Sequence, residues 1–127
     1  MADFYIDFEN VHYRGLIGID NLTKANKVFI YCRENEKANI LNYINRRKIS
    51  IRSKLEFIFI AEYTKNALDF VLLSDLASGY RKGNVIFVVS DDKGYDAAIN
   101  NLQKKLIFVS RCSSIADRSY QFIINIR

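Results

Sequence analysis

The chain has 127 residues, of which 50% are hydrophobic and 26% are charged. This is the length of one domain, with enough apolar residues to bury a core without disulfide bonds or a structural metal. No apolar run approaches the ~20 residues of a membrane span, and the N-terminus lacks the basic and then apolar pattern of a signal peptide. We therefore expect a single domain over residues 1–127, a cytoplasmic location and no membrane partner.

The formal net charge is +5, from 19 Lys and Arg residues against 14 Asp and Glu residues. Such an excess of positive charge favours an anionic partner such as nucleic acid. Much of it falls within one short segment that contains Arg46, Arg47, Lys48, Arg52 and Lys54. A solvated loop explains this segment as well as a binding surface does.

The two cysteines, Cys32 and Cys112, show no metal-ligand spacing, and the chain has a single histidine. We expect both cysteines to be free thiols in a reducing compartment. With one histidine, no Ser-His-Asp or Cys-His arrangement is evident.

Taken in chain order, the sequence predicts alternating strands and helices. Short apolar runs typical of buried strands occur at residues 4–8, 27–32, 55–61, 85–89 and 106–110. Apolar residues at helical spacing predict helices that begin at Asn35 or Glu36, at Lys65 and at Asp96. Thr64 is the expected N-cap of the middle helix, and Gly79 is its expected C-cap.

The other segments are expected to connect these elements. Residues 9–15 are predicted to form a loop, residues 17–22 a short helix or turn, and residues 113–119 a loop or turn. Ile49 and Ile51 would extend the third strand or form an edge piece, and residues 122–126 would form a last strand or a packed tail. The order predicts a three-layer α/β/α sandwich with a mostly parallel, Rossmann-like central sheet.

Several aspartates stand where such a sheet would bring them to one edge. Asp7 ends the first strand, Asp92 follows the fourth strand, and Asp96 opens the next helix. Asp69 lies near the start of the helix after the third strand. Because ligands bind beyond the carboxyl ends of parallel strands, we expect these carboxylates to converge.

Each aspartate also has a simpler explanation. Asp69 and Asp96 could complement helix dipoles, and Asp92 could be an ordinary loop residue. Asp7 is the hardest to explain in this way, because a charge within apolar sequence is expensive to bury. Converging carboxylates would not all stay ionised without cations, and oxygen ligands suit Mg²⁺ or Mn²⁺. Two such ions could activate a water and stabilise the leaving oxygen of a phosphodiester.

Other polar residues near these aspartates receive less specific predictions. Gly94 is expected to provide an awkward turn after the fourth strand. Asp75 and Asp91 are predicted to face solvent, and His12 and Tyr13 to be loop or lid residues.

Three motifs occur in order along nearly the whole chain: Ile6-Asp-Phe-Glu-Asn10, Lys65-Asn-Ala-Leu-Asp-Phe70 and Ser90-Asp-Asp-Lys-Gly-Tyr-Asp96. Together they resemble the PIN-like domains, and most closely the bacterial PIN-like and NYN-type group. The resemblance implies a Rossmann-like α/β/α sandwich that cleaves RNA with Mg²⁺ or Mn²⁺ held by acidic residues. By this resemblance the catalytic, metal-binding acids are Asp7, Asp69, Asp92 and Asp96.

The resemblance also implies an RNA-binding surface around these acids. Asn10 and Ser90 match polar residues that support the site, and Lys65, Asn66 and Lys93 could contact phosphate. We expect basic residues, Arg46 and Arg47 among them, to bind the RNA backbone without sequence preference. The resemblance also allows a homodimer, and an antitoxin or regulatory protein as partner.

The late motif departs from the better-known members, whose two acids are often only two positions apart. Here a Lys-Gly-Tyr insert separates Asp92 from Asp96, so it is open which of Asp91, Asp92 and Asp96 contacts metal.

The leading hypothesis is an Mg²⁺- or Mn²⁺-dependent endoribonuclease that acts on single-stranded or structured RNA and leaves a 5′-phosphate and a 3′-hydroxyl. The alternative is a catalytically inactive PIN-like module that binds RNA or protein. A response-regulator receiver is disfavoured, because the third strand ends in Ala61-Glu62 rather than in aspartate.

Overall fold

The computed structural model describes residues 1–61 and 67–119. Its strands form a 5-stranded parallel sheet in the order β3-β2-β1-β4-β5. Because β1 lies between β2 and β4, its last residue, Asp7, lies in the middle of the carboxyl edge of the sheet. The strands are β1 (Ala2–Asp7), β2 (Lys27–Cys32), β3 (Lys54–Phe59), β4 (Val85–Val89) and β5 (Val109–Cys112).

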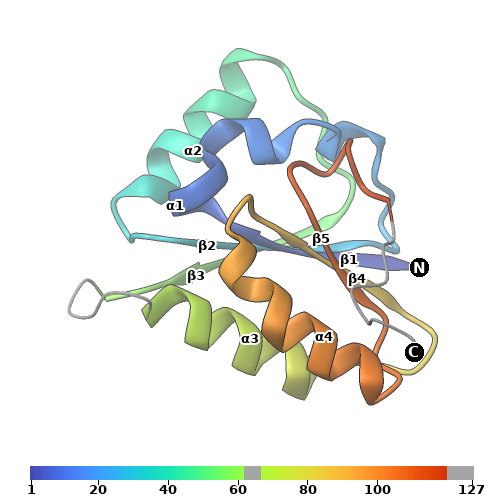
Figure 1. The fold of residues 1–127 in the computed structure, drawn as a ribbon. Helices are drawn as coiled ribbons and strands as arrows, with labels where there is room; N and C mark the ends of the chain where they lie inside the picture. The colour runs from blue at the N-terminus through green and yellow to red at the C-terminus, as the bar shows by residue number, and fades with distance from the viewer. Residues whose placement is uncertain (62–66, 120–127) are drawn as a thin grey trace.

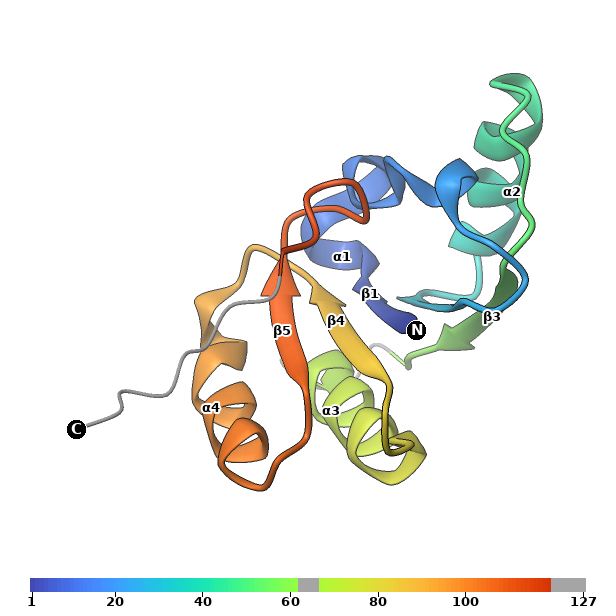
Figure 2. The ribbon, with the colours of Figure 1, turned by 90° about the vertical axis from the view of Figure 1, so that its right-hand side faces the viewer.

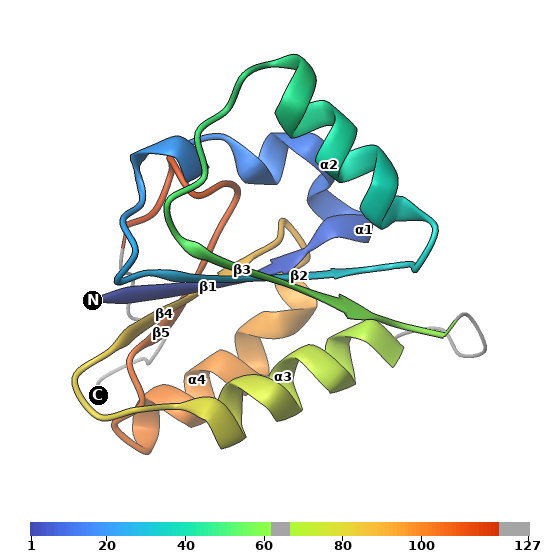
Figure 3. The same cartoon turned by 180° about the vertical axis from the view of Figure 1, so that it is seen from behind.

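Helices cover both faces of this sheet. Figures 1 and 3 show α1 and α2 over one face and α3 and α4 over the other, and Figure 2 shows the same layers from the β5 side. The predicted α/β/α sandwich is therefore confirmed. The α-helices are α1 (Phe8–Val11), α2 (Glu36–Arg46), α3 (Ala67–Gly79) and α4 (Asp96–Lys104), and the 3₁₀ helices are η1 (His12–Leu16), η2 (Ile19–Asn21) and η3 (Lys93–Tyr95).

The central strand buries side chains on both of its faces. Phe4 and Ile6 belong to the core under α1 and α2, whereas Tyr5 belongs to the core over α3 and α4. This two-sided burial explains why the strand sequences are continuously apolar rather than alternating. It also leaves Asp7 at the end of a strand that has no solvent-facing side.

Several elements lie where the sequence predicts them. β2 and β4 have the predicted bounds, α2 begins at Glu36, α4 begins at Asp96, and η2 falls within the predicted residues 17–22. Residues 113–119 turn without regular structure, also as predicted. The predicted Thr64 cap, the helix start at Lys65 and the segment 122–126 lie outside the described residues.

The N-terminal loop prediction was wrong. Residues 9–15 are helical, first in α1 and then in η1. Phe8, Val11 and Leu16 are 3%, 2% and 2% exposed, so these short turns bury apolar side chains against the sheet. The spacing of these apolar residues is the helical signal that the polar residues between them concealed.

Three smaller predictions also failed. β5 begins at Val109 rather than at residue 106, because Leu106 has a left-handed φ of 64° in the turn that ends α4 and is 77% exposed. Ile49 and Ile51 lie outside the strands and pack against the core from the connection between α2 and β3. Gly79 is the last helical residue of α3, and the left-handed glycine after this helix is Gly83, with φ of 93°.

Two further sequence expectations concern the thiols and the membrane. Cys32 and Cys112 are free and buried, and burial raises the pKa of the Cys32 thiol to about 11. No helix in residues 1–61 and 67–119 is long and apolar enough to cross a membrane.

Candidate active site

Asp7 is the most buried of the predicted acids, with 5% of its surface exposed. Its carboxylate oxygen Oδ2 accepts hydrogen bonds from Ser90 Oγ at 3.3 Å and from the Tyr95 hydroxyl at 3.1 Å. Burial raises the pKa of Asp7, as does the nearby Asp69 carboxylate, while hydrogen bonds from Tyr95, Ser90 and the Asn10 backbone oppose this rise. A carboxylate under such opposed influences is a candidate functional group.

Tyr95 joins Asp7 to Asp69. Its hydroxyl lies 3.0 Å from Asp69 Oδ1 as well as 3.1 Å from Asp7 Oδ2, and the residue is 1% exposed. Burial and the two carboxylates raise the pKa of Tyr95, so this phenol stays protonated. It has one proton and can donate it to only one carboxylate at a time. Two acids from β1 and α3 therefore share the Tyr95 hydroxyl, and among the described residues no cation pairs with either of them.

The turn after β4 links a third acid, Asp92, to Asp7 through Ser90. Ser90 is fully buried, and its Oγ accepts a hydrogen bond from the Asp92 backbone N–H at 3.1 Å. Asp92 Oδ1 accepts from the Gly94 N–H at 2.8 Å, and a Cβ on Gly94 would lie 3.0 Å from this same oxygen. Gly94 therefore leaves room for the Asp92 carboxylate, which a side chain at this position would push aside, and its φ is not left-handed. For the second oxygen of Asp92, the described part of the chain contains no hydrogen-bond partner.

Asp91 is exposed, as predicted, but it is paired. Its carboxylate accepts a hydrogen bond from Arg14 Nη2, and its backbone N–H donates to Asn10 Oδ1 at 2.7 Å. Hydrogen bonds from Ser113 and Arg14 lower the pKa of Asp91. These contacts tie the β4 turn to α1 and η1 and neutralise the charge of Asp91.

Asp96 has a cation of its own. Arg111, on β5, donates from Nε to Asp96 Oδ1 at 2.8 Å and from Nη2 to Asp96 Oδ2 at 3.3 Å. The same guanidinium donates from Nη1 to the Ser90 carbonyl at 3.2 Å. The structure thus brings Asp7 and Asp69 together at Tyr95 and places Asp96 in a separate pair with Arg111.

Two residues of this site were not singled out from the sequence. Tyr95 lies in the late motif but was treated as part of an insert, although a hydroxyl within an acidic motif is a detectable signal. Arg111 gave no signal, because its pairing with Asp96 depends on the packing of β5 beside α4. Asp75, predicted to face solvent, instead accepts a hydrogen bond from the Tyr31 hydroxyl at 2.8 Å, so that prediction was wrong.

The predicted RNA-binding residues fall into three places. Asn10 and Ser90 lie at the acidic edge, and Lys93 is exposed in η3 beside it. Arg46 and Arg47 are exposed at the end of α2. Lys65 and Asn66 lie outside the described residues.

The comparison with protein families decides what kind of domain carries this arrangement. A family model described as "PIN domain" matches residues 1–112, from the first residue to the end of β5. The chain belongs to the PIN domain family. No curated protein and no solved structure matches it. PIN domains are commonly metal-dependent nucleases, and the matched range includes Asp7, Asp69, Tyr95 and the β4 turn.

The acids of this PIN domain fit a hard divalent cation by the chemistry of their donors. Within residues 1–61 and 67–119, no group of three or more His, Cys, Asp or Glu side chains is placed to hold a metal ion. Mg²⁺, however, commonly uses one or two carboxylates and completes its coordination with water and substrate phosphate. Asp7 and Asp69 supply two carboxylates that share one proton donor. A dication there would provide the missing positive charge.

Proposed function

We propose that this PIN domain is an Mg²⁺- or Mn²⁺-dependent endoribonuclease with its centre at Asp7 and Asp69. The observation that supports this most strongly is the shared hydroxyl of Tyr95, which brings two carboxylates together where the described residues supply no cation to pair with either. Asp92 follows Ser90 in the same turn and has one oxygen free of described partners, but the described residues place no three acids around one ion, so its role as a ligand stays a prediction. Since Asp96 has Arg111 as its cation, we propose that it supports the β4 turn rather than holding the metal.

The proposed reaction is hydrolysis of an RNA phosphodiester at the carboxyl edge of the sheet, giving a 5′-phosphate and a 3′-hydroxyl. A bound dication would lower the pKa of the attacking water and offset negative charge on the phosphate. The protein residues have separate roles. Ser90, Tyr95 and the Asn10 backbone hold Asp7 in place, and exposed Lys93 is available to a phosphate oxygen.

A second candidate is a PIN domain that binds RNA without cleaving it. Two observations favour it: the described residues contain no three-acid group for a metal, and Arg111 already neutralises Asp96. The cytoplasmic location, the single-domain organisation, and a homodimer, antitoxin or regulatory protein as partner stay predictions.

The deciding experiment is an Mn²⁺ titration with a labelled single-stranded RNA. Wild type, Asp7→Asn and Asp69→Asn are purified side by side, with Asp20→Asn as a control for the loss of an exposed carboxylate in η2. We expect cleavage by wild type and Asp20→Asn that EDTA abolishes, and less than about 1% of this rate in the other two variants. Equal cleavage by wild type and Asp7→Asn would overturn the proposal. RNA binding by wild type without metal-dependent cleavage would establish the second candidate.

A further inference from the structure

A groove of about 480 Å³ lies between η1 and α2, on the face of the sheet opposite α3 and α4. We call it the Tyr–Arg groove. Figure 3 shows α1 and α2 side by side above the sheet at this point. The groove is lined by aromatic, amide and basic side chains: Tyr13, Asn39, Asn42, Tyr43, Arg46 and Arg47.

The groove contains a stacked pair of tyrosine rings with an arginine against one of them. The rings of Tyr13 and Tyr43 are 4.4 Å apart and inclined by 23°. The Arg47 guanidinium carbon lies 4.5 Å from the centroid of the Tyr43 ring. The Tyr43 ring therefore contacts both the Tyr13 ring and the Arg47 guanidinium. Arg47 is exposed, so its planar guanidinium is accessible to a further planar group.

Positive charge gathers at the same end of α2. Arg46, Arg47 and Lys48 are all exposed, and the described residues include no acidic partner for any of them. The helix ends with Lys48 in the left-handed region, at φ of 53°, followed by a hydrogen bond of 3.0 Å from Ile49 N to Ile44 O. This is a helix end at which glycine is preferred. The chain has a lysine there instead, which adds a third positive charge next to Arg47, a residue of the groove lining.

A series of aromatic contacts connects the Tyr–Arg groove to the acidic site. Phe8 directly follows Asp7, and its ring meets the Tyr13 ring edge-on with centroids 5.2 Å apart. Ring contacts therefore run from the residue after Asp7 to Tyr43 and Arg47. A polymer bound at the carboxyl edge would reach the groove by continuing past α1 toward the far end of α2.

We propose that the Tyr–Arg groove binds a single-stranded stretch of RNA outside the scissile bond, with a base stacked on Arg47 and phosphates near Arg46 and Lys48. This inference rests on the proposed function for the choice of RNA as partner. Single-stranded RNA is the class favoured, because its bases are free to stack on planar side chains whereas those of a duplex are already stacked. Basic residues at a helix end could also serve only to complement the helix dipole, and the experiments below separate the two roles.

The first experiment measures binding without cleavage. Fluorescence anisotropy in EDTA uses a labelled oligouridine of about 12 nucleotides, a duplex RNA and an abasic oligonucleotide of equal length. Arg47→Gln should weaken oligouridine binding by about 5–10-fold, and Arg47→Lys nearly as much, since lysine keeps the charge but loses the plane. Binding of Arg47→Lys to the abasic strand should match that of wild type. The control is Arg81→Gln, an equal charge change in the exposed turn between α3 and β4, with an expected change below about 2-fold.

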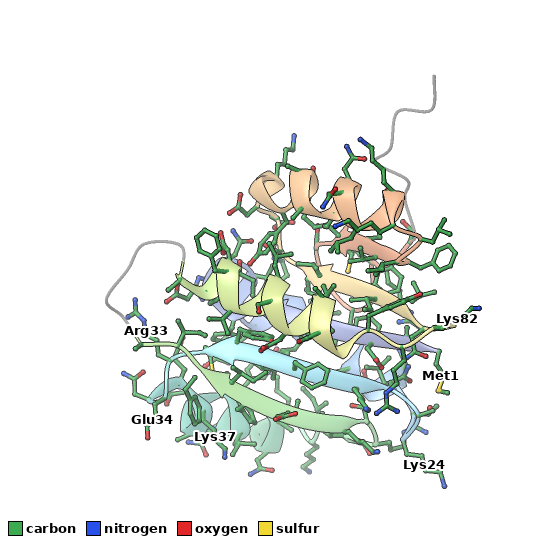
Figure 4. The ribbon with its side chains drawn as sticks, turned by 90° about the horizontal axis from the view of Figure 1, so that it is seen from below. Met1, Lys24, Arg33, Glu34, Lys37 and Lys82 are labelled. Carbon is green, nitrogen blue, oxygen red and sulfur yellow. The ribbon has the colours of Figure 1, made fainter. Side chains whose placement is uncertain are left out.

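A second variant, Lys48→Gly, separates loss of RNA binding from loss of folding. Lys48→Gly should raise the Tm, because glycine adopts the left-handed conformation without strain, and should nevertheless weaken oligouridine binding by about 2–3-fold. Its control is Lys82→Gly, which removes one lysine charge from the exposed turn between α3 and β4 and should leave oligouridine binding unchanged. Figure 4 places Lys82 at the opposite end of the sheet from Arg33 and Glu34.

Any of three results would overturn the proposal that the groove binds RNA. They are equal effects of Arg47→Gln and Arg81→Gln, duplex RNA bound as tightly as the single strand, or full binding by Lys48→Gly.

The experiments distinguish failure of this binding proposal from failure of the nuclease proposal. Binding that depends on Arg47 without any Mn²⁺-dependent cleavage overturns the nuclease alone, whereas cleavage with binding insensitive to Arg47 overturns the groove alone.

Discussion

Asp7 holds a charge in a place where water solvates it poorly. Burial is the largest cause of its raised pKa, and the neighbouring Asp69 carboxylate adds to it. The unfolded chain therefore releases this proton at a lower pH than the folded protein does. The stability contributed by the protonated form is fully present below the unfolded pKa and is lost as the pH rises through the folded pKa.

We therefore predict that Asp7→Asn, besides abolishing cleavage, raises the Tm at neutral pH. Asparagine keeps the size of the side chain and cannot ionise, so the cost of burying the charge disappears. The gain over wild type should be present at about pH 8 and absent at about pH 3, where the aspartate is largely protonated in both the folded and the unfolded chain. Thermal unfolding at both pH values measures it. A lower Tm for the variant at pH 8 would show that the ionised carboxylate is net stabilising.

The Tyr95 hydroxyl gives a second prediction at the same scale. Tyr95→Phe keeps the buried ring and removes the donor that Asp7 and Asp69 share. The pKa of Asp7 should rise further, and the free energy of unfolding at neutral pH should fall by about 1–3 kcal/mol. Urea unfolding at pH 8 and in acid measures this, and the deficit should shrink in acid. Tyr80→Phe, a partly buried tyrosine packed on the same core, should change stability by less than half as much.

At the scale of elements, Arg111 connects β5 to the start of α4 and to the turn after β4. It binds Asp96 at the start of α4 and the Ser90 carbonyl after β4, and it stands on β5. Its side chain is 20% exposed and that of Asp96 is 30% exposed, so the pair is partly screened from water. The burial makes this pair more costly to break than a surface ion pair.

We predict that Asp96→Asn destabilises the protein by about 1–2 kcal/mol and lowers cleavage by less than about 10-fold. The reason is that it loosens the β4 turn without removing a ligand. Urea unfolding and single-turnover cleavage measure the two effects, and Arg111→Gln should reproduce both. If Asp96→Asn is as inactive as Asp7→Asn while Arg111→Gln keeps its activity, then Asp96 is a ligand, as the sequence predicts.

The sequence predicted elements well where a local pattern was complete. β4 is an unbroken apolar run with a polar residue on each side, and its bounds were predicted correctly. α1 was missed because its buried face consists of few residues, and β5 was misplaced because the apolar Leu106 belongs to a helix-ending turn. Apolar composition alone does not distinguish a strand from a turn whose side chain is exposed.

In the candidate site, too, the sequence predicts what depends on topology but not what depends on the direction of one side chain. The meeting of Asp7 and Asp69 could be predicted, because parallel topology alone brings the end of β1 and the start of α3 to one edge. The pairing of Asp96 with Arg111 could not be predicted, because it depends on the direction of one side chain and on the packing of α4 against β5.

Over the whole molecule, the acids of the proposed catalytic centre and the basic residues of the proposed RNA-binding surface lie in different places. The acids of the proposed centre lie at the carboxyl edge of the sheet, while exposed Arg46, Arg47 and Lys48 lie at the far end of α2. The formal net charge of +5 thus includes a local excess of positive charge beside the Tyr–Arg groove. This arrangement favours a polyanion that is held along α2 and passes the acidic edge.

The salt dependence of RNA binding tests this arrangement. Each phosphate neutralised on a single strand contributes about −0.7 to the slope of log K against log salt concentration. The three basic residues at the end of α2, Arg46, Arg47 and Lys48, should therefore give a slope of about −2 or steeper in EDTA. Arg47→Gln should reduce the steepness by about 0.7, whereas Arg81→Gln should leave it unchanged. Anisotropy titrations at several salt concentrations measure the slopes. A slope that is equally steep in both variants would mean that the RNA is held by charges elsewhere on the molecule and that the end of α2 is only a solvated helix terminus.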